Sequence, residues 1–289
     1  MSREEFSFSS SDGLEIAYYR WRAPARAAAI VQIAHGMGEH ALRYAHVAEF
    51  LNKKGYHVYA NDHRGHGRTA KGIESMLGDF GEAGWDGLVA DLVMVTKLAR
   101  TREGKLPVIL LGHSMGSFAA QQYVLDNSAQ IAGLVLSGSA SVDKLAIDPS
   151  READLTAFNR AFEPARTPYD WLSRDPAAVD AYVADKLCGF GINKRAMETM
   201  AAGARRLADP AELSRIRADL PIYIFAGDKD PINHDLEWLK PLAERYRAAG
   251  IKDVTEKYYP EGRHEMLNET NRDEVMSDLL GWIQRAVKV

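Results

Sequence analysis

A serine flanked by glycines lies at a point where a strand would pass into a helix. The motif G-H-S-M-G, residues 112–116, follows the apolar run 108–111 and precedes a segment of helical composition. In this context the motif is typical of a tight turn that raises the serine hydroxyl above the edge of a sheet. Side chains at Gly112 and Gly116 would clash with neighbouring elements, whereas a serine that only caps a helix needs neither glycine. We therefore predict that Ser114 is a nucleophile.

A serine hydroxyl needs a base, and the base needs a carboxylate that orients it. Both residue types follow Ser114 in the order Ser, Asp, His. Asp230 lies in the turn after an apolar run and is the expected acid, with Asp228 in the same turn as the alternative. His264 lies on a loop before the last predicted helix and is the expected base. It does not begin an H-E-x-x-H zinc motif, because Asn268 stands where the second histidine would be.

Acyl transfer also needs two N–H donors for the negative oxygen that develops on the substrate. Met115, directly after the nucleophile, would supply the first donor. The segment H-G-M-G-E-H, residues 35–40, follows an early apolar run, and its glycines allow a sharp turn that can direct the N–H of Met37 to the same point. Since one base is sufficient, we interpret His35 and His40 as structural.

A second polar loop, residues 61–68, follows another apolar run. We interpret Asp62, Arg64 and His66 in it as a hydrogen-bonded network, because no third ligand has a spacing suited to a metal. The single cysteine, Cys188, cannot form an internal disulfide and is interpreted as a small buried apolar residue. We expect neither a metal nor an organic cofactor.

Short apolar runs supply the strands that would position these residues. Five runs lack alternation, as do strands buried on both faces of a parallel sheet. They are Ala28–Ala34, Tyr56–Ala60, Pro107–Leu111, Ile131–Leu136 and Pro221–Ala226. Two runs joined across Asp12-Gly13 predict an antiparallel start, and 254–259 adds an eighth strand. Helical spacing at 88–99 and 275–286 completes the pattern of a doubly wound α/β sheet with helices on both faces.

One segment interrupts this alternation. From about Val142 to about Arg206 there is no buried-strand pattern, and four prolines separate amphipathic pieces. We predict a helical cap at 142–206, inserted into a core domain formed by 1–141 and 207–289. Seven bulky cap residues either line an acyl pocket or form the core of the cap itself. They are Phe158, Phe162, Tyr169, Trp171, Tyr182, Leu187 and Phe190.

Five motifs in this order resemble the monoacylglycerol lipase and lysophospholipase group of the α/β-hydrolases. They are HGMGEH at 35–40 with Arg43 and Tyr44, DHRGHG at 62–67, GHSMG at 112–116, GDKD at 227–230, and GRH at 262–264 with Glu269. The resemblance implies an α/β-hydrolase fold, a helical cap between the sixth and seventh strands over an apolar acyl tunnel, and Met37 and Met115 as the oxyanion pair. Ser117 departs from the second glycine that this group commonly carries, which adds a hydroxyl near the floor of the site.

The expected activity is hydrolysis of a carboxylic ester through an acyl-enzyme, on a monoacylglycerol, a lysophospholipid or a related acyl ester. The serine turn does not encode the leaving group, so a thioester, an amide, a carbon–carbon bond or acyl transfer stays open, as does a non-catalytic sensor.

Composition limits the other classes of function. The chain has 289 residues, of which 46% are hydrophobic and 26% charged, as in ordinary globular proteins. A formal net charge of −4 gives no reason to expect nucleic acid as a partner. No apolar stretch approaches the about 18 residues of a membrane span, and the first residues are charged. We expect a cytoplasmic protein with a small-molecule ester or lipid substrate, and leave open its oligomeric state and peripheral membrane contact through the cap.

Overall fold

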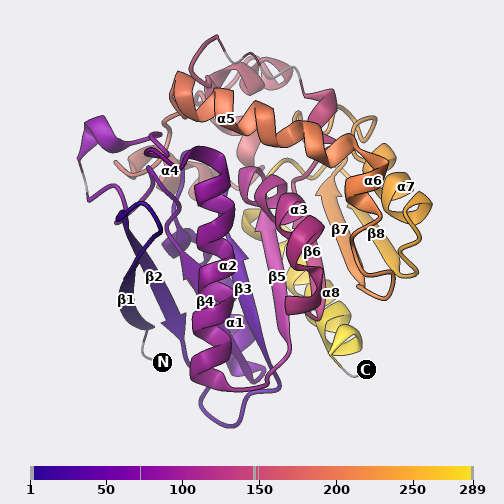
Figure 1. Ribbon diagram of the computed structural model, residues 1–289. Coiled ribbons are helices and arrows are strands. Elements are labelled where there is room, and N and C mark those ends of the chain that lie inside the picture. The colour runs from indigo at the N-terminus through magenta and orange to yellow at the C-terminus, as the bar shows by residue number, and fades with distance from the viewer. Residues whose placement is uncertain (1–2, 72, 146–147, 149, 288–289) are drawn as a thin grey trace.

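Eight strands form one sheet in the order β1-β2-β4-β3-β5-β6-β7-β8 (Figure 1). The structure is a computed structural model that describes residues 3–71, 73–145, 148 and 150–287. The strands are β1 (Arg3–Ser9), β2 (Glu15–Trp21), β3 (Ala29–Ala34), β4 (Tyr56–Asn61), β5 (Val108–His113), β6 (Gly133–Ser137), β7 (Ile222–Gly227) and β8 (Val254–Tyr259). β2 runs antiparallel to β1 and β4, and all other pairs are parallel. The predicted mostly parallel eight-stranded sheet is confirmed.

Strand β5 shows why the central strands need continuous apolar runs. Ile109 and Leu111 belong to the apolar cluster on one face of the sheet, whereas Val108 and Leu110 belong to the cluster on the other face. All four side chains are at most 1% exposed. Because both faces are covered, polar residues do not alternate with apolar ones along the strand.

Helices form a layer on each face of the sheet. α1 (Ala45–Lys53) and α8 (Arg272–Ala286) contribute apolar side chains to the cluster with Ile109, and α2 (Gly84–Glu103), α3 (Met115–Asn127) and α7 (Lys240–Ala248) contribute to the other cluster (Figure 1). No helix in the described ranges combines the length and the apolar composition needed to cross a membrane.

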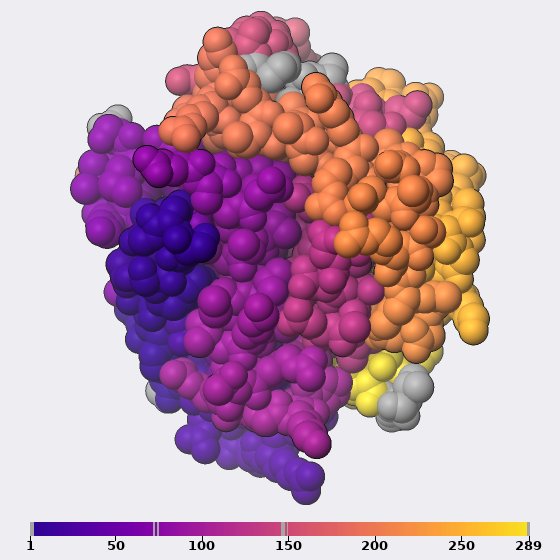
Figure 2. Space-filling view, viewed as in Figure 1, coloured from indigo at the N-terminus to yellow at the C-terminus, as the bar shows by residue number. Residues whose placement is uncertain are grey.

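The segment between β6 and β7 contains helices, and its described residues include no strand. Of the predicted insertion 142–206, residues 146, 147 and 149 lie outside the described residues. Its elements are 3-10 helices at Val142–Lys144, Leu155–Phe162, Asp170–Leu172 and Arg205–Ala208, with α4 (Pro176–Ala184) and α5 (Lys194–Ala204). The short α6 (Pro210–Leu213) then leads toward β7. In Figures 1 and 2, α5 runs across the top of the molecule, above the ends at which the parallel strands finish.

Candidate active site

Ser114 lies in the turn between β5 and α3 in a strained backbone conformation. Its φ of 51° and ψ of −124° are rare for a residue with a side chain. The N–H of Ser114 donates to the carbonyl oxygen of Ser137 at 2.9 Å and holds the turn on β6. A Cβ at Gly112 would lie 2.5 Å from the carbonyl oxygen of Gly116, and one at Gly116 would lie 2.2 Å from that of Ala34. The two glycines therefore permit the close packing that places the serine above the sheet.

His264, on the loop after β8, lies beside Asp230. His264 Nδ1 is 2.9 Å from Asp230 Oδ2, and Asp230 Oδ1 accepts the N–H of Ile232 at 2.9 Å. The two side chains are buried. Asp228 instead accepts the N–H of Glu261 at 2.8 Å. The structure thus brings Asp230, and not Asp228, against His264.

Two neighbouring histidines in the site, whose rings are tilted against each other by 50°, have opposite pKa shifts. Burial acts to lower the pKa of His264, but the charge of Asp230 and the hydrogen bond to it outweigh burial, so the net shift is upward. The ring of His113 lies 4.7 Å from that of His264, and burial holds the pKa of His113 well below its usual value. His113 therefore stays neutral beside an imidazole that is prepared to accept a proton.

Ser114 and His264 line the same cavity, which has a volume of about 670 Å³. Within the described part of the chain their side chains form no hydrogen bond with one another. Such bonds are often long in a free enzyme and shorten when substrate binds. The cavity has the size of a small-molecule site.

Met37 and Met115 also line this cavity. Their backbone N–H groups donate no hydrogen bond to any part of the chain that the structure describes. The residues on either side of Met37 are held in place, because the N–H of Gly36 donates to Glu39 Oε1 at 2.5 Å and that of Gly38 donates to His66 Nε2 at 3.2 Å. Two free donors therefore border the cavity next to Ser114.

The predicted hydrogen-bonded network of Asp62, Arg64 and His66 is connected only in part: His66 bonds to the main chain of Arg64, whereas the side chains of Asp62 and Arg64 have separate partners. Asp62 accepts from the N–H of Ala41 and the hydroxyl of Tyr19. Arg64 is fully buried and pairs with Asp12 and Asp91. His66 Nδ1 lies 2.7 Å from the carbonyl oxygen of Arg64, which leaves Nε2 as the acceptor for Gly38. Of the three, His66 is the residue that fixes the loop carrying Met37.

The added hydroxyl of Ser117 is accommodated below Ser114. Ser117 Oγ donates to the carbonyl oxygen of Ser114 at 2.6 Å and lies 2.8 Å from Ser139 Oγ. The departure from glycine thus adds hydrogen bonds to the turn.

A charged cluster beside the cavity was missed by the sequence analysis. The guanidinium of Arg43 donates to Glu39 Oε2 at 2.6 Å and to both carboxylate oxygens of Glu265 at 2.5 and 2.7 Å. Tyr44 Oη donates to Glu39 Oε1 at 2.7 Å. Glu39 and Glu265 line the cavity. Arg43 and Tyr44 were noted only as parts of a motif, and the partner Glu265 lies 222 residues from Arg43, so local spacing carried no signal.

The predicted cap segment holds the loop of His264 through main-chain bonds. The N–H of His264 donates to the carbonyl oxygen of Trp171 at 3.4 Å, and the N–H of Glu265 donates to that of Leu172 at 2.8 Å. The indole of Trp171 also packs against the His264 ring, with centroids 4.9 Å apart and the ring planes tilted by 37°. The position of the histidine therefore depends on this segment.

The seven bulky cap candidates divide into two groups. Phe158, Trp171 and Tyr182 line the cavity, and the other four are not among its lining residues. Further apolar side chains line the same cavity. They are Phe118, Leu145, Leu155, Met197, Met200 and Ile232. Charged residues of the predicted cap line it too, namely Asp148, Arg151, Glu152, Asp154 and Arg160. The cavity thus combines an apolar lining with carboxyl and guanidinium groups.

Comparisons with known proteins agree with this geometry. Residues 25–271 match the model of the family described as serine aminopeptidase, S33. The chain is 32% identical over 288 residues to a monoacylglycerol lipase of Mycolicibacterium smegmatis, covering 98% of this chain and 97% of that protein. It is 25% identical over 291 residues to the monoglyceride lipase of Rattus norvegicus, covering 97% of this chain and 90% of that one. A crystal structure of a thermostable carboxyl esterase from Bacillus coagulans in complex with glycerol superposes with a TM-score of 0.87, at 28% identity and 99% coverage of both chains.

Proposed function

Because the chain belongs to the serine aminopeptidase S33 family of α/β-hydrolases, we propose that it cleaves monoacylglycerols with Ser114, His264 and Asp230 as the catalytic triad. It is a serine hydrolase of carboxylic esters, of the monoacylglycerol lipase type. We further propose that glycerol is the alcohol released, and we assign a role to each residue of the site.

In the proposed reaction, His264 Nε2 takes the proton of Ser114 Oγ as that oxygen attacks the ester carbonyl. The free N–H groups of Met37 and Met115 donate to the oxyanion of the tetrahedral intermediate. His264 then gives its proton to the departing alcohol, and water activated by the same imidazole releases the acid from Ser114. Asp230 orients the ring through Nδ1 and stabilises its charged form.

The polarity of the cavity is the observation that carries the substrate assignment. Its apolar lining, which includes Phe158, suits an acyl chain. The lining also includes Glu39 and Glu265, whose oxygens accept hydrogen bonds from alcohol hydroxyls. Arg43 is already paired with both of these carboxyl groups, whereas Arg151 and Arg160 line the cavity as well. The choice of a glycerol ester over a lysophospholipid therefore rests on the two carboxylate acceptors, and a comparison of the two lipids tests it.

We propose that residues 142–206 form a cap and that 1–141 and 207–289 form the core, as the sequence predicts. The cap supplies one wall of the cavity and would also be the surface that meets a lipid aggregate. Val183 on α4 is a large apolar side chain that is 49% exposed, which supports such a contact.

The substrate assignment is tested by comparing 1-monoacylglycerol with lysophosphatidylcholine of the same acyl chain, both below their aggregation concentrations. We expect a kcat/KM at least about tenfold higher for the monoacylglycerol, since one unmatched polar contact costs about 1–3 kcal/mol. Released fatty acid is the measured product, and the Ser114→Ala protein gives the background. A preference for lysophosphatidylcholine, or hydrolysis of neither lipid, would refute the monoacylglycerol proposal.

Chain-length preference tests the apolar wall of the cavity. In a filled channel each added methylene contributes about 0.8 kcal/mol, so kcat/KM for p-nitrophenyl esters should rise a few-fold per carbon up to an optimum. Phe158→Ala should move that optimum to longer chains, because it enlarges the cavity. Phe162→Ala is the matched control: it changes the same residue type in the same 3-10 helix, but Phe162 does not line the cavity. A flat profile, or equal shifts in both variants, would contradict the assignment of the channel.

A further inference from the structure

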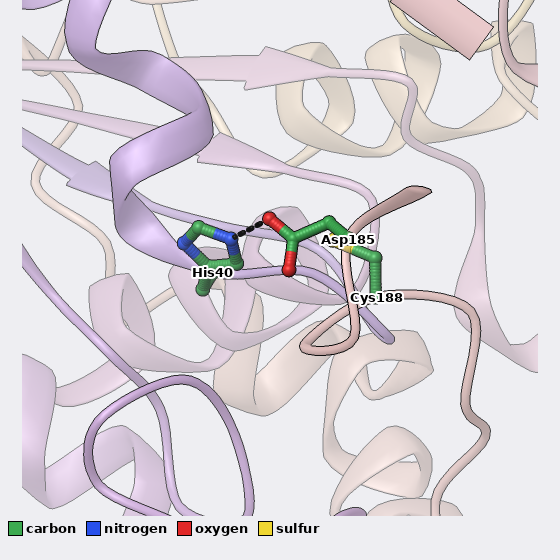
Figure 3. A group of neighbouring side chains, drawn as sticks. All are labelled: His40, Asp185 and Cys188. Carbon is green, nitrogen blue, oxygen red and sulfur yellow. Dashed lines mark hydrogen bonds and ion pairs between the residues drawn. The ribbon is translucent and has the colours of Figure 1, made fainter. Parts of the chain in front are cut away.

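A second group of chemically reactive side chains lies outside the triad, where the proposed cap meets the loop that carries Met37. His40 comes from the segment after β3, whereas Asp185 and Cys188 come from the turn after α4 (Figure 3). One nitrogen of His40, one carboxylate oxygen of Asp185 and the sulfur of Cys188 all lie within 4.8 Å of one another. His40 Nε2 is 2.9 Å from Asp185 Oδ2. Imidazole, carboxylate and thiolate are the three side-chain ligands that zinc prefers.

The turn after α4 has the local geometry of a metal-ligand pair. The N–H of Cys188 donates to the carbonyl oxygen of Asp185 at 3.0 Å, so the two side chains project from one turn with two residues between them. The same spacing joins paired cysteines in structural zinc sites. Asp185 Oδ1 accepts the N–H of Leu187 at 2.8 Å, which leaves Oδ2 turned toward His40. A hydrogen bond to the second oxygen is how ligating carboxylates are commonly oriented.

Bonds that use none of the three ligand atoms hold the two segments together. The carbonyl oxygen of Gly38 accepts the N–H of Gly189 at 3.0 Å and the hydroxyl of Tyr182 at 2.8 Å. His40 and Asp185 are therefore kept adjacent whether or not an ion is present. The nearby carboxyl groups of Glu39 and Glu265 outnumber the single guanidinium of Arg43, so the surrounding charge does not oppose a cation.

We propose that His40, Asp185 and Cys188 bind one zinc ion, with a fourth coordination position left to water. Zinc bonds of about 2.0 to 2.3 Å place tetrahedral ligands roughly 3.3 to 3.8 Å apart, so the widest separation must shorten by about 1 Å. On binding, the proton between His40 and Asp185 moves from Nε2 to Nδ1, the thiol proton passes to solvent, and the ion occupies the space between the three ligands. The sequence analysis expected no metal, and it considered ligand spacing only at the loop 61–68. Local spacing could not indicate the present group, because 145 residues separate His40 from Asp185.

The ion would join the cap directly to the loop that carries Met37. The site is separate from Ser114 and does not depend on the identity of the ester substrate. A ligand that binds only the folded chain raises its melting temperature, by a few degrees when the ion is in large excess over its Kd. Zinc should therefore stabilise the protein through this contact.

The test is titration of the EDTA-treated, dialysed full-length protein with zinc chloride in competition with a chromogenic chelator. We expect about one equivalent bound, with Cys188→Ser and His40→Gln each weakening binding by about a hundredfold or more, since loss of an outer-shell partner alone costs about 10- to 100-fold. His234→Gln is the matched control, because His234 is an exposed histidine that also pairs with a carboxylate, that of Glu237. It should bind zinc as the unaltered protein does.

Two further readouts do not depend on a variant keeping its fold. Cobalt(II) added to the unaltered protein should give a thiolate-to-cobalt charge-transfer band, and zinc should slow alkylation of Cys188 by iodoacetamide, with EDTA restoring the rate. Circular dichroism of each variant establishes that it is folded. Absence of zinc binding by the unaltered protein, equal binding by folded Cys188→Ser, or alkylation that zinc does not slow would overturn the proposal.

Discussion

Replacing Ser114 with alanine should lower ester turnover by on the order of a million-fold while leaving the fold intact. Members of a serine triad act as a unit, and loss of the nucleophile leaves only the contribution of the oxyanion donors and substrate binding. Ser114 lies in a strained turn. Alanine keeps the Cβ of serine and removes only the hydroxyl group, so the backbone of the turn should be preserved. The measurement is release of fatty acid from monoacylglycerol, together with labelling by a fluorophosphonate probe.

Ser117→Ala is the control for this substitution. Its hydroxyl lies one helical turn away and bonds to the carbonyl oxygen of Ser114, and Ser117 is not among the residues that line the cavity. We expect Ser117→Ala to keep probe labelling and to lose less than about tenfold in kcat, the scale of one ordinary hydrogen bond. More than a few per cent of turnover left in Ser114→Ala would refute the assigned nucleophile.

Asp230→Asn should lower turnover by about ten-thousand-fold, because an amide in this position favours the wrong tautomer of the histidine. The pH dependence of kcat/KM gives an independent test of the pairing between Asp230 and His264. His264 must be neutral to act as a base, so kcat/KM falls as the pH drops through its pKa, which the charge of Asp230 helps to hold above the usual value of a histidine. Without the carboxylate the effect of burial remains, so the acid limb of the residual activity should move to lower pH.

Asp228→Asn is the matched control, since the same change is made two residues earlier in the same turn. Asp228 bonds to the backbone of Glu261 and not to His264, so both the rate and the acid limb should stay close to those of the unaltered protein. If Asp228→Asn showed the larger loss, Asp228 would be the acid and the geometry around His264 would have been misassigned.

The parts of this molecule that the sequence predicted are those governed by local rules. The central strands were predictable because a strand covered on both faces must be apolar throughout, as Val108–Leu111 are. The placement of Ser114 followed from two glycines whose Cβ atoms would overlap the main chain. Asp230 was the expected acid with Asp228 as the alternative, because both lie in one turn and only its three-dimensional path decides which carboxylate meets His264.

The parts that escaped prediction depend on contacts between distant segments. Phe158 and Phe162 lie in one 3-10 helix, yet only Phe158 reaches the cavity, and composition does not reveal which side of such a helix faces inward. The pairing of Arg43 with Glu265 spans 222 residues, so no local spacing could indicate it. Substrate specificity is determined by such contacts, which is why the sequence left the alcohol undecided.

The two main-chain hydrogen bonds from the loop of His264 to the carbonyl oxygens of Trp171 and Leu172 bear on how this hydrolase can be engineered. A carbonyl oxygen is present whatever side chain its residue carries. Side chains lining the cavity, such as Phe158, can therefore be exchanged to change selectivity without removing the acceptors that hold the loop of His264. A graft that replaces the whole insertion must reproduce the backbone path at Trp171–Leu172. Otherwise the loop of His264 would lose these two hydrogen bonds, and the position of the histidine would change together with the binding pocket.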